Sequence, residues 1–62
     1  MPSNIQYLVE ETIKKCQSSA ADMRTAAHTT DNNAARNSFE QTAQQLEECV
    51  QKCRSALNQL VK

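Results

Sequence analysis

The chain has 62 residues and a mass of about 6.9 kDa, and its 7 Lys and Arg residues balance its 7 Asp and Glu residues. A formal net charge of zero gives no bulk attraction to nucleic acid or to an anionic membrane. With no glycine and a single proline, the composition excludes multi-domain architectures, most enzymes with a deep cleft, and β-rich folds that need glycine turns. We therefore expect one all-α domain over residues 1–62.

A first helix is predicted over about residues 4–28. Ser3 can cap its first amides, and Gln6, three residues later, can complete a capping box. Apolar or small residues then alternate at spacings of four and three, which is typical of a helix that packs against other helices. These residues are Val9, Ile13, Cys16, Ala20, Met23 and Ala27.

The pattern breaks over residues 28–33, where the sequence reads HTTDNN and consists of poor helix formers. We expect the chain to reverse here. Thr30 or Asp31 is expected to cap the second helix, and Asn32 or Asn33 to adopt a left-handed conformation in place of the absent glycine. One continuous helix with a weak middle is the alternative.

A second helix is predicted over about residues 32–61. Its main apolar stripe again follows spacings of four and three, and consists of Ala35, Phe39, Thr42, Leu46, Cys49, Cys53, Ala56 and Leu60. A parallel stripe of Ala43, Val50 and Leu57 flanks it. Because the connection is short, the two helices are expected to form an antiparallel hairpin.

A hairpin of this size leaves half of each apolar stripe in solvent, and so short a chain rarely buries a sufficient core alone. The sequence therefore predicts a homodimer or higher homo-oligomer in which hairpins pair into a four-helix bundle. The expected core and interface residues are Val9, Ile13, Cys16, Met23, Phe39, Leu46, Cys49, Val50, Cys53, Leu57 and Leu60.

The three cysteines carry the only candidate binding chemistry. Cys49 and Cys53 are four residues apart on one helical face, and with Cys16 they could hold Cu(I) or Zn(II) as thiolates. Packing of free thiols in the core is the plainer interpretation. Counting outward from the turn places Cys16 opposite Gln45 or Leu46, which is too far from Cys49 for a disulfide within one hairpin.

No spacing of acid, base and nucleophile indicates catalysis, so we expect no enzyme and no cofactor beyond the metal alternative. His28 is expected to lie at the carboxyl end of the first helix, where its charged form would favour the terminal carbonyls. No apolar run is long enough to span a bilayer, and the odd number of cysteines suits a reducing, cytoplasmic setting. Basic residues lie near acidic ones, so binding of RNA or DNA is only the weakest of three hypotheses.

Residues 29–46 read TTDNNAARNSFEQTAQQL. This stretch resembles a family of very small proteins from endospore-forming bacteria that is known only as a domain of unknown function. That family has an Ala- and Gln-rich helix, a break of Thr with Asp or Asn, and a second helix with an aromatic residue four before an alanine. The resemblance implies a non-enzymatic, sporulation-linked protein of the cytoplasm or spore interior. It supplies no catalytic residues, and the three cysteines depart from its pattern.

The leading functional hypothesis is thus a structural or protein-interaction module.

Overall fold

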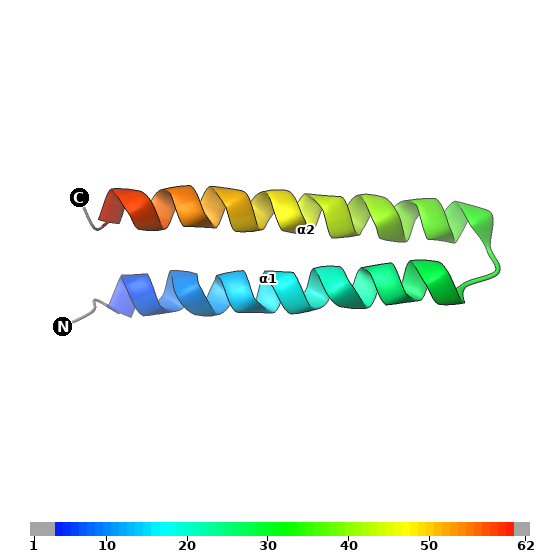
Figure 1. Ribbon diagram of the computed structural model, residues 1–62, viewed down its shortest axis with the longest axis horizontal. Coiled ribbons are helices and arrows are strands. Elements are labelled where there is room, and N and C mark those ends of the chain that lie inside the picture. The colour runs from blue at the N-terminus through cyan, green and yellow to red at the C-terminus, as the bar shows by residue number, and fades with distance from the viewer. Residues whose placement is uncertain (1–3, 61–62) are drawn as a thin grey trace.

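The computed structural model describes residues 4–60, which form two long helices joined by a short connection. Helix α1 spans Asn4–Thr29 and helix α2 spans Asn33–Leu60. The helices lie side by side and antiparallel, so the start of α1 and the end of α2 lie at the same end of the molecule (Figure 1). The predicted hairpin is confirmed, and the alternative of one continuous helix is wrong. The expected Ser3 cap and the last expected helical residue, 61, lie outside the described residues.

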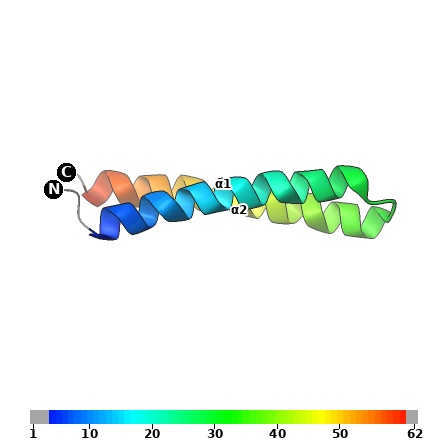
Figure 2. The same cartoon turned by 90° about the horizontal axis from the view of Figure 1, so that it is seen from below.

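The helices pack through a repeat of seven residues. Along α1 the buried side chains are spaced by seven, and the same spacing separates the two buried side chains of α2. These five residues are Ile13, Ala20, Ala27, Ala43 and Val50. A period of 3.5 residues per turn is slightly shorter than that of a straight helix, and it keeps one stripe facing the partner only if the helices coil around each other. Figure 2 shows the two helices crossing at a shallow angle, as this requirement predicts.

A second row of larger side chains runs beside the buried row and is only half-buried. It consists of Val9, Cys16, Met23, Phe39, Leu46 and Cys53. The contact between the helices is therefore asymmetric. Its closed side holds three alanines, among which Ala43 has no exposed surface, together with Ile13 and Val50, and the residues of its other side remain partly in solvent. Small residues allow the closed side to approach closely, whereas the bulkier row is left without complete cover.

The stripe of α2 that faces α1 differs from the main stripe expected from the sequence. Ala43 and Val50, from the flanking stripe, are buried, whereas Thr42, Cys49 and Ala56 are exposed. Residues next to each other in sequence are about 100° apart around a helix, so a single neighbouring helix cannot cover both. One helix partner buries one of the two stripes and leaves the other open.

The connection is capped by residues other than those expected. The side-chain Oδ1 of Asn32 accepts a hydrogen bond of 3.0 Å from the backbone N–H of Ala35, which makes Asn32 the N-cap of α2 in place of Thr30 or Asp31. Thr30 instead accepts a 3.2 Å bond from the N–H of Asn32 through its hydroxyl oxygen. The expectation of a left-handed Asn32 or Asn33 is wrong, since no described residue has a positive φ.

Arg36 explains how α1 ends without a glycine. Its guanidinium crosses from α2 and donates 3.0 Å and 2.8 Å hydrogen bonds to the carbonyls of Ala27 and Thr30. Carbonyls in the last turn of a helix have no partner within it, and a left-handed glycine commonly allows other backbone amides to satisfy them. Here a partly buried side chain from the returning helix supplies the donors.

Replacing Ala43 with leucine is expected to lower the free energy of unfolding by about 1–3 kcal/mol, because the closed side of the seam has no room for added methylene groups. Urea unfolding followed by circular dichroism measures this cost. The matched control is Ala34→Leu on the same helix, where the side chain is exposed and the change should stay within about 0.5 kcal/mol. Equal effects at the two positions would contradict the described packing.

Replacing Asn32 with alanine removes the cap of α2 and should cost about 1 kcal/mol of stability in the same measurement. Asn33→Ala is the control, since this neighbour lies inside the helix and alanine has the higher helix propensity. Asn33→Ala is expected to leave the protein as stable as before or slightly more stable. A larger loss at Asn33 than at Asn32 would show that the cap is wrongly assigned.

Candidate functional site

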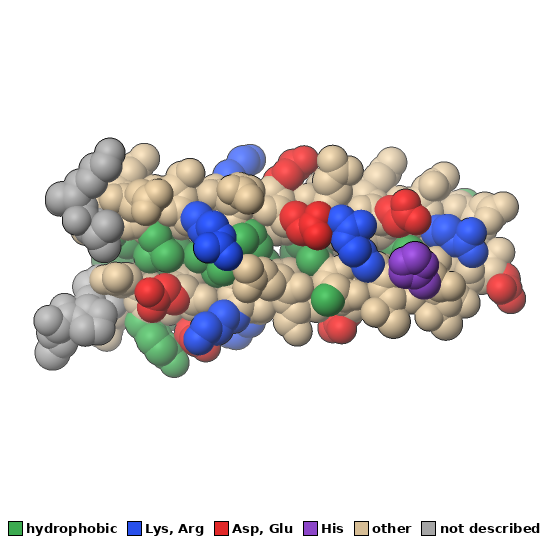
Figure 3. Space-filling view, in the orientation of Figure 1, with side chains coloured by type: hydrophobic (Ala, Val, Ile, Leu, Met, Phe, Trp, Pro, Cys, Tyr) green, Lys and Arg blue, Asp and Glu red, His purple; other side chains and the backbone are tan. Residues whose placement is uncertain are grey.

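The hairpin has two flanks of opposite character along the groove between its helices. On one flank, the helical positions four residues after the buried ones are occupied by Gln17, Arg24, Glu47 and Arg54, and the position after Ala27 falls in the connection. We call this the polar face. Figure 3 shows one side of the molecule, on which acidic and basic side chains lie near one another over both helices.

An ion pair links the helices across the polar face. Arg24 donates from Nη2 to Glu47 Oε1 at 2.6 Å and from Nε to Oε2 at 3.2 Å. Glu47 correspondingly raises the pKa of Arg24, mainly through this hydrogen bonding. Both side chains are about half exposed, at 47% and 52%, so solvent screens the pair and its contribution to stability is small. Its geometry joins the two helices at a defined register.

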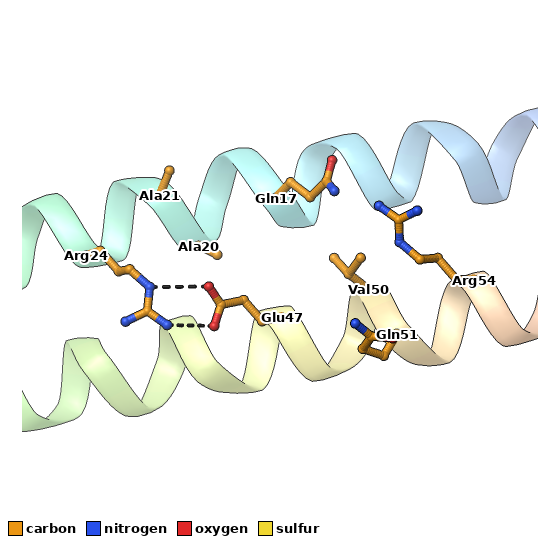
Figure 4. Close-up of a pocket in the computed structure, with 8 residues that line it drawn as sticks. All are labelled: Gln17, Ala20, Ala21, Arg24, Glu47, Val50, Gln51 and Arg54. Atoms are coloured by element: carbon orange, nitrogen blue, oxygen red, sulfur yellow. Dashed lines mark hydrogen bonds and ion pairs between the residues drawn. The ribbon is translucent and has the colours of Figure 1, made fainter.

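Beside this ion pair lies an open groove of about 640 Å³. In Figure 4, Ala20 and Val50 point into the space between the helices, whereas Ala21 points away from it. The remaining lining consists of long polar side chains, including Gln17, Gln51 and Arg54. The lining offers charge and amide groups but contains no cysteine, histidine, serine or threonine to serve as a nucleophile.

The other flank of the groove has no charge. On this flank lies the residue that directly precedes each buried residue in sequence. These residues are Thr12, Ser19, Ala26, Thr42 and Cys49. Together with the half-buried row these residues form a surface that we call the open face: Val9, Thr12, Cys16, Ser19, Met23, Ala26, Phe39, Thr42, Leu46, Cys49 and Cys53. Every member is apolar, a thiol or a hydroxyl. The open face therefore costs much less to remove from water than the polar face.

The threonines of the open face are already paired within their own helices. Thr12 Oγ1 donates to the Leu8 carbonyl at 2.8 Å, and Thr42 Oγ1 donates to the Ser38 carbonyl at 2.8 Å. Burial of a hydroxyl is costly when its donor is left without an acceptor. Because these two donors are satisfied locally, covering the open face with another apolar surface leaves neither of them unpaired.

All three thiols lie on the open face. Cys49 is exposed, whereas Cys16 and Cys53 are half-buried. The expectation that Cys16 lies too far from Cys49 for a disulfide within one hairpin stays a prediction.

Burial is the main reason why the pKa values of the Cys16 and Cys53 thiols are raised, and the nearby thiol of Cys49 raises them further. The thiols are therefore held in the neutral form. Among residues 4–60, no group of three His, Cys, Asp or Glu side chains is arranged to hold a metal ion. Binding of Cu(I) or Zn(II) by Cys16, Cys49 and Cys53 stays a prediction.

His28 lies in the last turn of α1, as expected, and is exposed. The carbonyls near that helix end are bound by Arg36 instead. Nothing in the local sequence distinguishes Arg36 from the other basic residues, because its role depends on the returning helix folding back over the turn. The core and interface residues expected from the sequence separate into buried, half-buried and exposed groups, with Cys49 and Leu60 in the exposed group.

Two antiparallel helices packed through a seven-residue repeat, with a charged flank and an uncharged one, define a small coiled-coil hairpin. None of the helical segments within residues 4–60 is long and apolar enough to cross a membrane. The family described as protein of unknown function (DUF1657) matches residues 9–59, and the chain belongs to this family. Comparison with curated proteins and with solved structures finds no match. The bacterial group and the link to sporulation implied by the resemblance stay predictions.

Because the pKa values of two thiols are raised, the free energy of unfolding is expected to change with pH in the alkaline range. In the unfolded chain the thiols ionise at their ordinary pKa, whereas in the fold Cys16 and Cys53 ionise only at higher pH. Their contribution is therefore complete below the ordinary thiol pKa and is lost as the pH rises through the raised values. Urea midpoints measured in reductant from about pH 7 to about pH 10 should fall. The double variant C16S/C53S should fall less steeply, and an equally steep fall would refute the role of these thiols.

Proposed function

We propose that two copies of this hairpin pack open face against open face into a four-helix bundle, and that the protein acts as a non-enzymatic structural or protein-interaction module. The observation that carries the proposal is the complete absence of charge from the open face between Val9 and Cys53. Within residues 4–60, the charged side chains lie on the polar face, around the connection and on the outward surfaces of the helices.

The distribution of charge favours a buried role for the open face. In a hairpin that stays monomeric, both flanks of the groove face solvent. Charged side chains would then be expected equally on both flanks. Here one flank holds Arg24, Glu47 and Arg54, whereas the equivalent positions on the other hold Thr42 and Cys49. Depletion of charge at the centre of a surface is typical of protein interfaces.

The exposed area also favours a partner. The chain exposes 4854 Å². A compact folded protein of its mass, 6.9 kDa, exposes about 4000 Å². The excess of about 850 Å² is close to the area of about 800 Å² that each partner contributes to a standard interface. The single layer of two helices, with extents of 48 × 15 × 10 Å, explains this excess.

A second copy suits the open face better than a charged partner does. The face has no charge with which to select an acidic or a basic surface, and its thiols, methyl groups and two paired threonine hydroxyls are compatible with a copy of the same surface. A twofold axis places the same patch on both sides of the interface. Facing rows such as Met23 and Leu46 would then complete the cover that a single hairpin leaves unfinished.

Thr42→Glu tests this assembly with little effect on the hairpin itself, because Thr42 is exposed and lies on the open face. Wild-type protein is expected to sediment at twice the chain mass in reductant. The variant should raise the dimer dissociation constant at least about tenfold, since each interface would bury two carboxylates. Analytical ultracentrifugation over a concentration series measures the constant.

Gln41→Glu is the matched control, because it adds the same charge at the adjacent exposed position, which lies off the open face. It should leave the dissociation constant within about twofold of the wild type, and circular dichroism should show equal helix content in all three proteins. A folded wild-type monomer at tens of micromolar would overturn the proposal. So would equal weakening by both substitutions.

A further inference from the structure

We propose that the two hairpins of the dimer lie in the same direction, with both connections at one end and the twofold axis running along the helices. This inference rests on the proposed function, because it specifies how the second copy covers the open face. The observation that carries it is the unequal distribution of large apolar side chains between the two ends of that face.

The rows of the open face continue in steps of seven residues to the distal end of the hairpin, which we define as the end away from the connection. Seven residues before Thr12 lies Ile5, and seven residues after Cys53 lies Leu60. Both side chains are exposed, at 59% and 47%, although both are large and apolar. The start of α1 and the end of α2 place them at the same end of the molecule (Figure 1). Within residues 4–60, every large apolar side chain that is exposed belongs to this end: Ile5, Tyr7, Leu8 and Leu60.

At the other end the same rows reach the connection and lose their apolar character. Seven residues after Met23 lies Thr30, and seven residues before Phe39 lies Asn32. Both polar side chains take part in the hydrogen bonds that shape the connection. Residues 28–33 read HTTDNN, so this end of the hairpin offers no large apolar side chain.

Helix dipoles do not choose between the two possible directions of the second hairpin. In the same direction, α1 faces α2 of the second copy. In opposite directions, α1 faces α1 and α2 faces α2. Neighbouring helices are antiparallel in both arrangements, so the dipoles are paired equally well. The side chains at the two ends therefore decide the direction.

The distal ends favour the same direction. In that arrangement Ile5 of each copy lies near Leu60 of the other, and the apolar side chains of the two distal ends remove one another from water. In opposite directions, each distal end would lie over the connection of the other copy. That contact would bury less apolar area and would cover polar groups such as Asn32 that now face solvent.

Ile5→Glu tests the covered distal end with all three native cysteines in place. It should raise the dimer dissociation constant measured by sedimentation at least about tenfold, because two carboxylates would be buried among apolar groups. Tyr7→Glu is the matched control: Tyr7 is equally exposed, at 60%, and lies off the open face, in the row of Lys14. Both positions are in the first turn of α1, so the effect of the new charge on the helix dipole is shared.

The control should leave the dissociation constant within about twofold of the wild type. In opposite directions, the carboxylate introduced at position 5 would lie near the connection of the second copy, which contains His28 and Arg36 among polar groups. Ile5→Glu would then weaken the dimer no more than Tyr7→Glu does. Small and equal effects of the two substitutions on a wild-type dimer would therefore overturn the proposed direction.

Distances between spin labels measure the direction itself. The background C16A/C49A/C53A removes the native thiols, and a single cysteine is introduced by Asn58→Cys near the distal end or by Ala34→Cys near the connection. Both positions are exposed and lie off the open face. In the same direction, two identical labels lie across the bundle, less than about 30 Å apart. In opposite directions, the rise of about 1.5 Å per residue separates identical labels by more than about 35 Å.

Mixed dimers, with Ala34→Cys in one copy and Asn58→Cys in the other, should give the reverse result, more than about 35 Å in the same direction. Long distances for both identical pairs would overturn the proposed direction and leave the dimer intact. Wild-type protein that sediments as a monomer would overturn the dimer as well. If the alanine background is itself monomeric, the comparison of Ile5→Glu with Tyr7→Glu decides the direction.

Discussion

The close contact of two helices along a row of small side chains is the constraint on which the rest of this structure depends. Ala20, Ala27 and Ala43 have almost no exposed surface, and their size sets how closely the helices approach. A two-helix contact is narrow, so it buries one stripe of each helix and covers the next stripe only in part. The bulky half-buried row, the exposed thiol of Cys49 and the uncharged open face all follow from this narrow contact.

The elements of the hairpin could be predicted from local sequence, whereas its register could not. Spacings of four and three and the polar stretch at 28–33 placed both helices within a residue of their observed ends. The stripe of α2 that is buried against α1 was not predicted, because Thr42 and Ala43 are adjacent in sequence and both belong to apolar stripes. The roles of Asn32 and Arg36 depend on which residues the turn brings together, and many side chains of this sequence could have supplied an equivalent bond.

The candidate site was predicted in part. The spacing of Cys49 and Cys53 alone placed them on one face of α2, and Cys16 of α1 lies on the same open face. The division into a polar and an open face was not expected, because it appears only after the buried stripe is known. Once Ala43 and Val50 are fixed in the seam, the neighbouring positions of α2 divide between the two flanks. The charged groups that border the groove and the thiols then fall on opposite flanks, so the flank that repels a second hairpin is separated from the one that suits it.

The two bonds that Arg36 makes to α1 have a consequence for the order of folding. The end of α1 is completed by a donor from α2, so neither half of the bend is finished until the chain has doubled back. Closure of so short a loop is fast and costs little entropy. Pairing of the two helices is therefore expected to start at the connection and to proceed toward the ends of the hairpin. In this order α1 pairs with α2 of its own chain before it meets another molecule. A chain that stays straight to exchange helices with a neighbour would forfeit both bonds, which opposes domain swapping.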